Sequence, residues 1–370
     1  MEQKSRNQII VKTGIIGLAT NIMLAVFKAM VGLLSNSIAV MLDAVNNLSD
    51  AMSSVITIVG IKLAAKPADK KHPLGYGRVE YLSAMLISCI VLFAGLTALI
   101  ESAKKILSPE AASFTPVSLF IILVAVVVKL ILGRYTKKKG QETDSDSLVA
   151  SGSDALFDAM VSLATLASAC IALLWGINLD SWLGAVIALV IMKAGIGMLR
   201  DTLDDILGKR VDTQLSQNLK KEIASFDQVL GVYDLYLDSY GPQSLAGSVH
   251  VEISDRLSAS QIDELTRKIS GCIYRKFKVV LTCGIYAVPS QGNDLRHLYE
   301  EIRELVLNHA GVLQMHGFHV DDSGKIIFFD LVRDFSVKDV DQLLREIEEE
   351  LVKRHPEYQY VIIADVDLSD

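Results

Sequence analysis

Six long apolar runs fill the first 207 residues of this 370-residue chain. Each has about 20 residues or more, which is the length a helix needs to cross the hydrocarbon core of a bilayer. Backbone polar groups in lipid must be paired within their own segment, so runs of this length predict transmembrane helices. The six predicted spans cover approximately residues 12–34, 36–65, 80–107, 114–134, 148–177 and 179–207.

Lysine and arginine are distributed unevenly around these runs. The N-terminus and the second and fourth loops are basic, whereas the first and fifth loops carry no Lys or Arg. Cytoplasmic loops are usually the basic ones, so we expect a multi-pass protein of the cell (cytoplasmic) membrane with both termini in the cytoplasm. Lys28 and Lys129 lie toward the ends of their runs, and we expect both to extend to the interface.

Two pairs of polar residues interrupt the second and fifth runs. Asn46 and Asp50 are four residues apart, as are Asp154 and Asp158, so each pair shares one face of its helix. A charged residue at mid-membrane depth costs roughly 2.5–3.5 kcal/mol on insertion scales. Such groups sometimes only hydrogen-bond helices together. Three carboxylates, however, repel one another unless they are protonated or bind a cation. If the two helices are neighbours, the four side chains predict a cation site.

A site with only oxygen ligands favours particular metals and a particular function. Carboxylates and an amide suit Mg²⁺, Ca²⁺ or Mn²⁺ better than copper or a dedicated zinc centre. A cation site inside the membrane predicts transport, and carboxylates that release protons on binding metal allow proton exchange. A rival interpretation is an intramembrane enzyme that uses the carboxylates as general acid and base. The enzyme is less favoured, because the two residues of each pair lie on one helix and the four groups would surround a single ion rather than a bond to be cleaved. A third interpretation is a membrane-anchored metal sensor.

The remainder of the chain reads as soluble α+β sequence. We expect a domain over residues 208–290 with the order αββαβ and an apparent repeat of it over residues 291–370, after the transmembrane domain of residues 1–207. The net charge of −7, without a basic patch to offset it, argues against nucleic acid as a partner. Four scattered cysteines form neither a disulfide framework nor a thiolate zinc site.

Three features together resemble a known family. They are the paired ligands of the second and fifth runs, the segment HPLGYGRVE at residues 72–80, and the segment GVYDL at residues 231–235. The chain from about residue 10 to 290 resembles the cation diffusion facilitators. That resemblance implies a six-helix divalent-metal/proton antiporter with a ferredoxin-like cytoplasmic domain, acting as a homodimer and without a cofactor. The pattern NxxxD with DxxxD resembles the bacterial manganese-efflux branch, whereas an exporter of Zn²⁺, Fe²⁺, Co²⁺ or Cd²⁺ is the alternative.

The resemblance also implies weaker sites. Asp69 and His72 match a second metal site between spans two and three. Tyr76 replaces a histidine that is usual there, so the site is weak or absent. His72 equally fits a role in shaping the loop. Arg78 matches a basic residue that pairs with an acid after span six, here Asp204 (Asp205 is the alternative), in a charge interlock between protomers.

Histidines of the cytoplasmic half are the last candidates. The family's zinc ligands there correspond to Tyr233, His250, Gly284 and Tyr286, of which only His250 readily binds metal. The second copy offers a further group, either a metal cluster or, more often for such residues, a solvated turn. This group is His316, His319, Asp321 and Asp322.

Overall fold

The computed structural model describes residues 3–34, 38–108, 116–175, 180–242, 244–290, 294–321 and 325–366. The chain divides into two compact units, one formed by Met1–Lys209 with Tyr240–Gln243 and the other by Arg210–Ser239 with Ser244–Asp370. The first is called the helical unit below, and the second is called the α+β unit.

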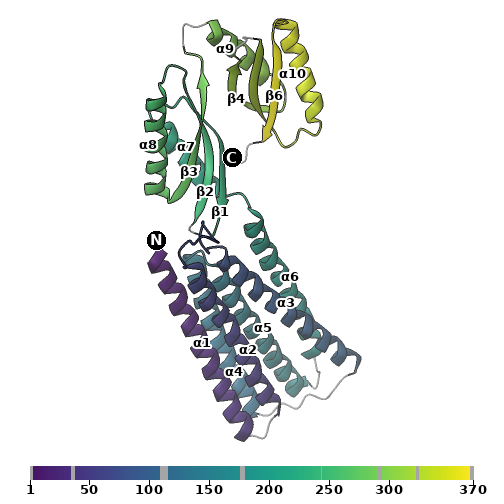
Figure 1. The fold of residues 1–370 in the computed structure, drawn as a ribbon. Helices are drawn as coiled ribbons and strands as arrows, with labels where there is room; N and C mark the ends of the chain where they lie inside the picture. Colours follow the sequence, from purple (N-terminus) through teal and green to yellow (C-terminus); the bar gives the residue numbers. More distant parts are fainter. Residues whose placement is uncertain are drawn as a thin grey trace. The chain divides into compact units, whose positions relative to one another are not determined.

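Long helices form the helical unit and overlap the six predicted runs. In the described residues they are α1 Gln3–Leu34, α2 Ile38–Ala64, α3 Val79–Leu107, α4 Pro116–Glu142, α5 Asp146–Trp175 and α6 Asp180–Leu207. The closest helix pairs are α1 with α2, α3 with α6, and α4 with α5, and α2 also packs against α5 (Figure 1). Four of the helices are long and apolar enough in their described residues to cross a membrane, namely α1, α3, α4 and α6. The other two, α2 and α5, are the helices that carry the polar pairs.

Helix α4 extends well beyond the predicted end of its run at residue 134. The basic residues that follow were expected in a loop, but Lys, Gln and Glu favour helix, so the helix continues to Glu142. It ends where Asp144 adopts a positive φ of 49° and the Ser145 amide donates to the Gly140 carbonyl. This left-handed residue closes the helix, and α5 begins directly afterwards.

Glycines bring α4 and α5 unusually close. A Cβ on Gly152 would lie 2.4 Å from the Lys137 backbone nitrogen, and one on Gly140 would lie 2.7 Å from the Val149 nitrogen. A Cβ on Gly133 would lie 2.7 Å from the Leu156 side chain. Small residues at helix crossings permit this backbone approach. The crossing places the middle of α4 against the acidic face of α5.

The α+β unit contains two three-stranded sheets of the same topology. The first half comprises α7 Thr213–Ala224, β1 Gly231–Ser239, β2 Leu245–Ser254, α8 Ala259–Phe277 and β3 Val279–Val288. The second comprises α9 Asp294–Leu307, β4 Val312–Val320, β5 Ile326–Arg333, α10 Val340–Arg354 and β6 Gln359–Val366. In each sheet the first two strands are antiparallel and the third is parallel to the second.

Each half of this unit has its own core. Apolar residues of α8, at Ile269 and Ile273, are fully buried against the first sheet, and Ile347 and Leu351 of α10 belong to the second core. Ser258 forms a capping box with Gln261 that fixes the start of α8. Amphipathic helices therefore cover one face of each sheet.

Candidate functional site

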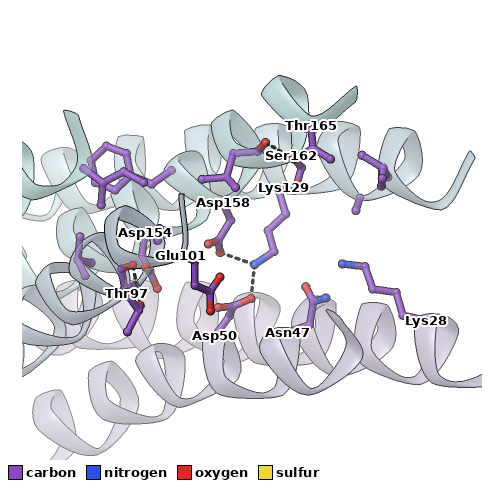
Figure 2. Close-up of a pocket in the computed structure, with 18 residues that line it drawn as sticks. Lys28, Asn47, Asp50, Thr97, Glu101, Lys129, Asp154, Asp158, Ser162 and Thr165 are labelled. Carbon is purple, nitrogen blue, oxygen red and sulfur yellow. Dashed lines mark hydrogen bonds and ion pairs between the residues drawn. The ribbon is translucent and has the colours of Figure 1, made fainter. Parts of the chain in front are cut away.

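A cavity of about 470 Å³ lies among the helices of the helical unit and contains most of the predicted site. Asp50 of α2 and Asp154 and Asp158 of α5 all line it (Figure 2). Asn46 lies in α2, but its side chain is outside what the structure describes. Its neighbour Asn47 lines the cavity and is 2% exposed. The structure therefore brings three carboxylates from two helices into one polar cavity.

Lys129 occupies the centre of this carboxylate group. Its Nζ lies 2.6 Å from Asp50 Oδ2 and 2.8 Å from Asp158 Oδ2. Figure 2 draws both contacts as dashed lines. The expectation that Lys129 extends to the interface was wrong, because α4 continues to Glu142 and Lys129 is therefore at its midpoint. Lys28 was predicted in the same way and is likewise buried, 3% exposed, in the cavity lining.

Asp154 has a different partner from the other two carboxylates. Ser53 of α2 donates from its Oγ to Asp154 Oδ2 over 3.1 Å, and both residues are buried. Thr57, one turn further along α2, donates weakly to the Ser147 carbonyl of α5 over 3.4 Å. These hydrogen bonds hold α2 against α5, so the carboxylate of Asp154 is positioned by the helix pair itself.

The cavity continues toward the end of the bundle where α3 and α5 finish. Thr97 and Glu101 lie one turn apart on α3, and Ser162 and Thr165 follow Asp158 on α5. Sequence reasoning missed these residues. The signal was present in Glu101, an acid near the end of an otherwise apolar run. Within the described residues, no three His, Cys, Asp or Glu side chains already have the geometry of a preformed metal centre.

The loop between α2 and α3 contains the predicted second site. Asp69 Oδ1 accepts hydrogen bonds from the amides of Lys71 and His72 at 2.9 and 2.7 Å, and Tyr76 donates its hydroxyl to Oδ2 over 2.6 Å. The Tyr76 hydrogen bond, followed by that of the His72 amide, lowers the pKa of the Asp69 carboxyl. Both oxygens of Asp69 are engaged within the loop, which supports the loop-shaping interpretation of His72.

The proposed interlock residues lie at the ends of two helices. Arg78 directly precedes α3, and Asp204 lies in the last turns of α6. Asp205, the alternative acid, pairs with Lys209 of its own helix end at 3.1 Å. An interlock joins two copies of the chain, so the pairing of Arg78 with Asp204 stays a prediction.

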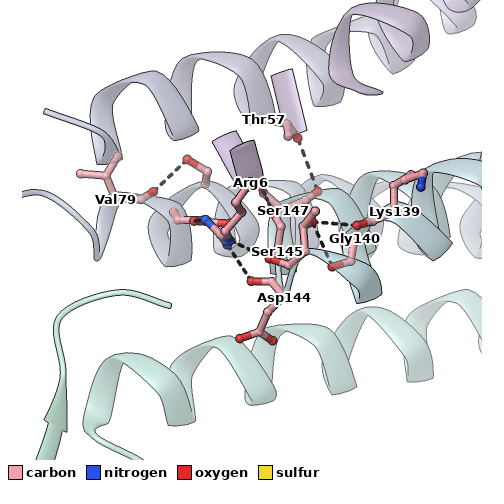
Figure 3. Close-up of polar contacts among 11 residues, drawn as sticks. Arg6, Thr57, Val79, Lys139, Gly140, Asp144, Ser145 and Ser147 are labelled. Atoms are coloured by element: carbon pink, nitrogen blue, oxygen red, sulfur yellow. Dashed lines mark hydrogen bonds and ion pairs between the residues drawn. The ribbon is translucent and has the colours of Figure 1, made fainter. Parts of the chain in front are cut away.

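Arg6 forms a buried clamp that sequence reasoning did not identify. Its guanidinium binds both carboxylate oxygens of Glu80 at 2.8 and 2.9 Å and donates to the Thr143 and Asp144 carbonyls at 2.6 and 2.7 Å (Figure 3). Arg6 and Glu80 are 4% and 1% exposed. The clamp joins α1, the start of α3 and the α4–α5 turn. A basic residue near the N-terminus indicates membrane topology alone, and nothing in the sequence points to Glu80 as its partner.

In the α+β unit, the predicted histidines meet at the boundary between the two halves. Tyr233, His250 and Gly284 are register partners across β1, β2 and β3. The Nδ1 of His250 lies 2.9 Å from Asp234 Oδ2, and its ring stacks on Tyr286. His250 therefore already has an acidic partner within its own sheet.

His316 from β4 completes this boundary. It is 0% exposed, with Nε2 at 3.1 Å from Asp234 Oδ1 and Nδ1 at 3.8 Å from Asp330 Oδ2. The single hydroxyl proton of Tyr286 is shared between Asp234 and Asp330, at 2.9 and 3.0 Å. The solvated-turn interpretation was wrong for His316.

The other members of that predicted group lie elsewhere. His319 is exposed on β4, and Asp321 accepts from the amides of Lys325 and Ile326 in the turn before β5. Asp322 is outside the described residues. The four residues therefore do not gather in one place among those that the structure describes.

Comparison with known proteins places the chain in a family. A family model described as the cation efflux transmembrane domain matches residues 14–207, and a second, the cation efflux protein cytoplasmic domain, matches residues 296–364. The chain belongs to the cation diffusion facilitator family. The cytoplasmic match falls on the second α+β half, beyond the expected end of the resemblance at residue 290.

Curated relatives give the same class. The manganese efflux system protein MneP of Bacillus subtilis is 28% identical over 77% of this chain and 97% of its own length. An uncharacterized transporter of Methanocaldococcus jannaschii is 26% identical over 68% of this chain and 88% of its own. Metal tolerance protein 2 of rice is 29% identical over 68% of this chain and 71% of its own length. The protein is a membrane-spanning divalent-metal efflux transporter.

Proposed function

We propose that the protein is a Mn²⁺/H⁺ antiporter that exports Mn²⁺ from the cytoplasm. The observation that carries the proposal is the meeting of Asp50, Asp154 and Asp158 in one cavity between α2 and α5. Asn46, one turn before Asp50, supplies the fourth ligand. All four ligand atoms are oxygens, the kind that Mn²⁺ accepts readily and that copper does not prefer.

The transport cycle follows the alternating-access scheme. Metal enters from the cytoplasm, binds the four oxygen ligands, and is released after the helices rock to open the other side. If the basic loops are cytoplasmic, as the sequence predicts, α3 and α5 end on the outer side. We propose that the cavity lining at Thr97, Glu101, Ser162 and Thr165 then forms the exit path. Carboxylates that bind metal release protons and take them up again on release, which couples the two fluxes.

Manganese is favoured over the other divalent metals for two reasons. The proposed ligands include no histidine or cysteine, which zinc would prefer. The relative MneP also carries manganese efflux in its name. Mn²⁺ is the weakest binder of the first-row series, so selection depends on geometry and supply rather than on affinity.

The assembly is proposed as a two-fold homodimer. Support comes from the match to the family's cytoplasmic domain and from the positions of Arg78 and Asp204 at neighbouring helix ends. We further propose that α1–α6 all span the membrane and that both termini are cytoplasmic. The matching strand order of the two sheets supports a duplicated ferredoxin-like domain over residues 208–290 and 291–370.

The decisive experiment measures Mn²⁺-driven proton flux in proteoliposomes. Asp50→Ala and Asp154→Ala are expected to abolish flux, since each removes a ligand. Asp201→Ala, which changes an exposed aspartate of α6, is the matched control and should transport normally. Unchanged flux in both cavity variants would show that the site assignment is wrong.

Selectivity is tested separately through Asn46. Replacing its oxygen by a ring nitrogen in Asn46→His should add Zn²⁺ to the transported metals in a competition series. No change in the competition order would remove Asn46 from the selecting ligands while leaving the transport site intact.

A further inference from the structure

The ammonium of Lys129 lies where the proposed metal ligands converge. It contacts one oxygen of Asp50 and one of Asp158, and Lys129 is 3% exposed. The contact distances of 2.6 and 2.8 Å are those of direct charge-assisted hydrogen bonds. A covalently attached cation from α4 thus joins the acidic residues of α2 and α5.

Lys129 and a divalent cation compete for the same oxygens. A metal bound by carboxylates lies about 2.0–2.6 Å from its oxygen ligands. That position overlaps the space of an ammonium that contacts the same atoms. The two positive charges would also repel strongly at such a separation inside a protein. Occupancy by one therefore requires displacement of the other.

The structure provides room for Lys129 to move. Lysine has a flexible four-carbon stem, so its ammonium can swing while α4 stays in place. The cavity of about 470 Å³ continues from the carboxylates to Thr97 and Glu101 of α3, which offer an oxygen-lined position for a displaced ammonium. The clamp formed by Arg6 contrasts with this, since its guanidinium is fixed by four hydrogen bonds.

We propose that Lys129 is a tethered counter-cation that exchanges with the transported metal at Asp50 and Asp158. The inference rests on the proposed transport site. The ammonium keeps Asp50 and Asp158 paired when no metal is bound, while Asp154, which hydrogen-bonds to Ser53, remains to take up a proton. Its competition also lowers the net affinity for metal, which promotes release. The tether gives the ammonium a high effective concentration at the carboxylates. Only a cation that the carboxylates attract more strongly than the ammonium therefore displaces it. Lys129 thereby selects divalent over monovalent cations.

Equilibrium binding to the purified full-length protein tests the affinity claim. Lys129→Met removes the competing charge and keeps a long stem, so Mn²⁺ should bind about tenfold or more tightly. Excess Na⁺ should then begin to compete with Mn²⁺, whereas in the native protein it should not. Lys129→Arg retains the charge and should not bind more tightly. Lys193→Met alters an exposed lysine of α6 outside the cavity and is the matched control.

A second measurement needs no substitution. An amine-reactive reagent followed by mass spectrometry should label Lys129 faster in the native protein with Mn²⁺ present, because the displaced ammonium is less protected. Lys193 should react at the same rate with and without metal. This readout remains available if Lys129→Met does not fold.

The outcomes separate the exchange from the transport site. If Asp50→Ala binds Mn²⁺ as tightly as the native protein, the proposed site itself is wrong. If Asp50→Ala loses binding while Lys129→Met shows unchanged or weaker affinity, the exchange is overturned and the site stands. Labelling of Lys129 that is unaffected or slowed by Mn²⁺ would also overturn the exchange.

Discussion

Arg6 and Lys129 are both buried against carboxylates in the helical unit, and the two arrangements differ in almost every other respect. Arg6 binds Glu80 with both ends of its guanidinium and also donates to two backbone carbonyls. Lys129 contacts two separate aspartates and lies beside a cavity of about 470 Å³. Figures 2 and 3 show the open and the closed arrangement respectively.

The difference follows from the two side chains and their surroundings. Arginine is always charged, and its rigid fork of donors matches one carboxylate, which suits a permanent joint. Lysine is a compact charge on a flexible stem and leaves lone pairs of Asp50 and Asp158 available. A buried ion pair whose cation is held by four hydrogen bonds is a structural joint, whereas one beside a cavity has the freedom to exchange. Packing, rather than charge, decides which role a buried pair has.

The largest expected effect is on the stability contributed by the Arg6–Glu80 pair, called the closed pair here; the contact of Lys129 with Asp50 and Asp158 is the open one. Arg6→Met leaves Glu80 buried without a partner, and breaking such a pair typically costs about 3–5 kcal/mol of unfolding free energy. Lys12→Met changes an exposed basic residue of the same helix and should have little effect. Thermal unfolding of the full-length protein in detergent measures both. Lys129→Met should lose less stability than Arg6→Met, because the cavity lets its carboxylates reach water. Equal losses would contradict the distinction.

The boundary within the α+β unit offers an intermediate case. His316 lies between Asp234 and Asp330 and is covered by the rings of Tyr233 and Tyr286. Its position resembles the closed pair more than the open one. Neither ring nitrogen of His316 has a hydrogen-bond partner among the described residues, so its contacts are close approaches to the two carboxylates and packing of the rings. His316→Leu should therefore cost about 1–2 kcal/mol, the range of an ordinary buried substitution. The change would be seen as faster hydrogen exchange in β4 and β5 of the full chain.

The matched control for this variant is His319→Leu. His319 is exposed on the same strand, so its loss should leave exchange in β4 and β5 unchanged. If both variants exchange alike, His316 is not part of a joint between the two halves.

Sequence predicted the elements of the fold well where a local pattern determines them. Apolar runs located α1–α6, and the predicted order αββαβ matches α7, β1, β2, α8 and β3. The four-residue spacing also found Asp50, Asp154 and Asp158, which share one cavity. Local periodicity is enough for such features because it acts within a single helix.

The partners of these residues could not be predicted in the same way. Lys129 was placed near a span end because its helix was expected to stop at residue 134, and its contact with Asp158 depends on the close α4–α5 crossing at glycines. Met315 and His316 are neighbours in regular register on β4, so their side chains lie on opposite faces of the strand. Both are buried because Met315 belongs to the second core, whereas His316 lies against Asp234 and Tyr286 of the first half. Burial by another sheet depends on tertiary packing, which the alternation within one strand does not predict.

The smallest expected effect concerns a buried carboxylate for which no ion pair is found among the described residues. Glu252 of β2 is 5% exposed, and its Oε1 has no hydrogen-bond partner among the described residues. Burial raises the pKa of this carboxyl, and nearby charges including His316 only partly oppose the shift. A carboxyl with a raised folded-state pKa stabilises the fold while protonated and loses that contribution as the pH rises through that value.

Glu252→Gln should therefore stabilise the protein above the raised pKa, by about 1 kcal/mol at pH 8, because an ionised group is no longer buried without full compensation. The gain should shrink as the pH falls and vanish below the ordinary range of glutamate, at about pH 4. Thermal unfolding of the full chain across this range measures it. Glu300→Gln, at an exposed position, is the control. A gain that is the same at every pH would mean that ionisation of Glu252 is not its cause. Such a result would limit the contrast between paired and unpaired buried charges to the helical unit.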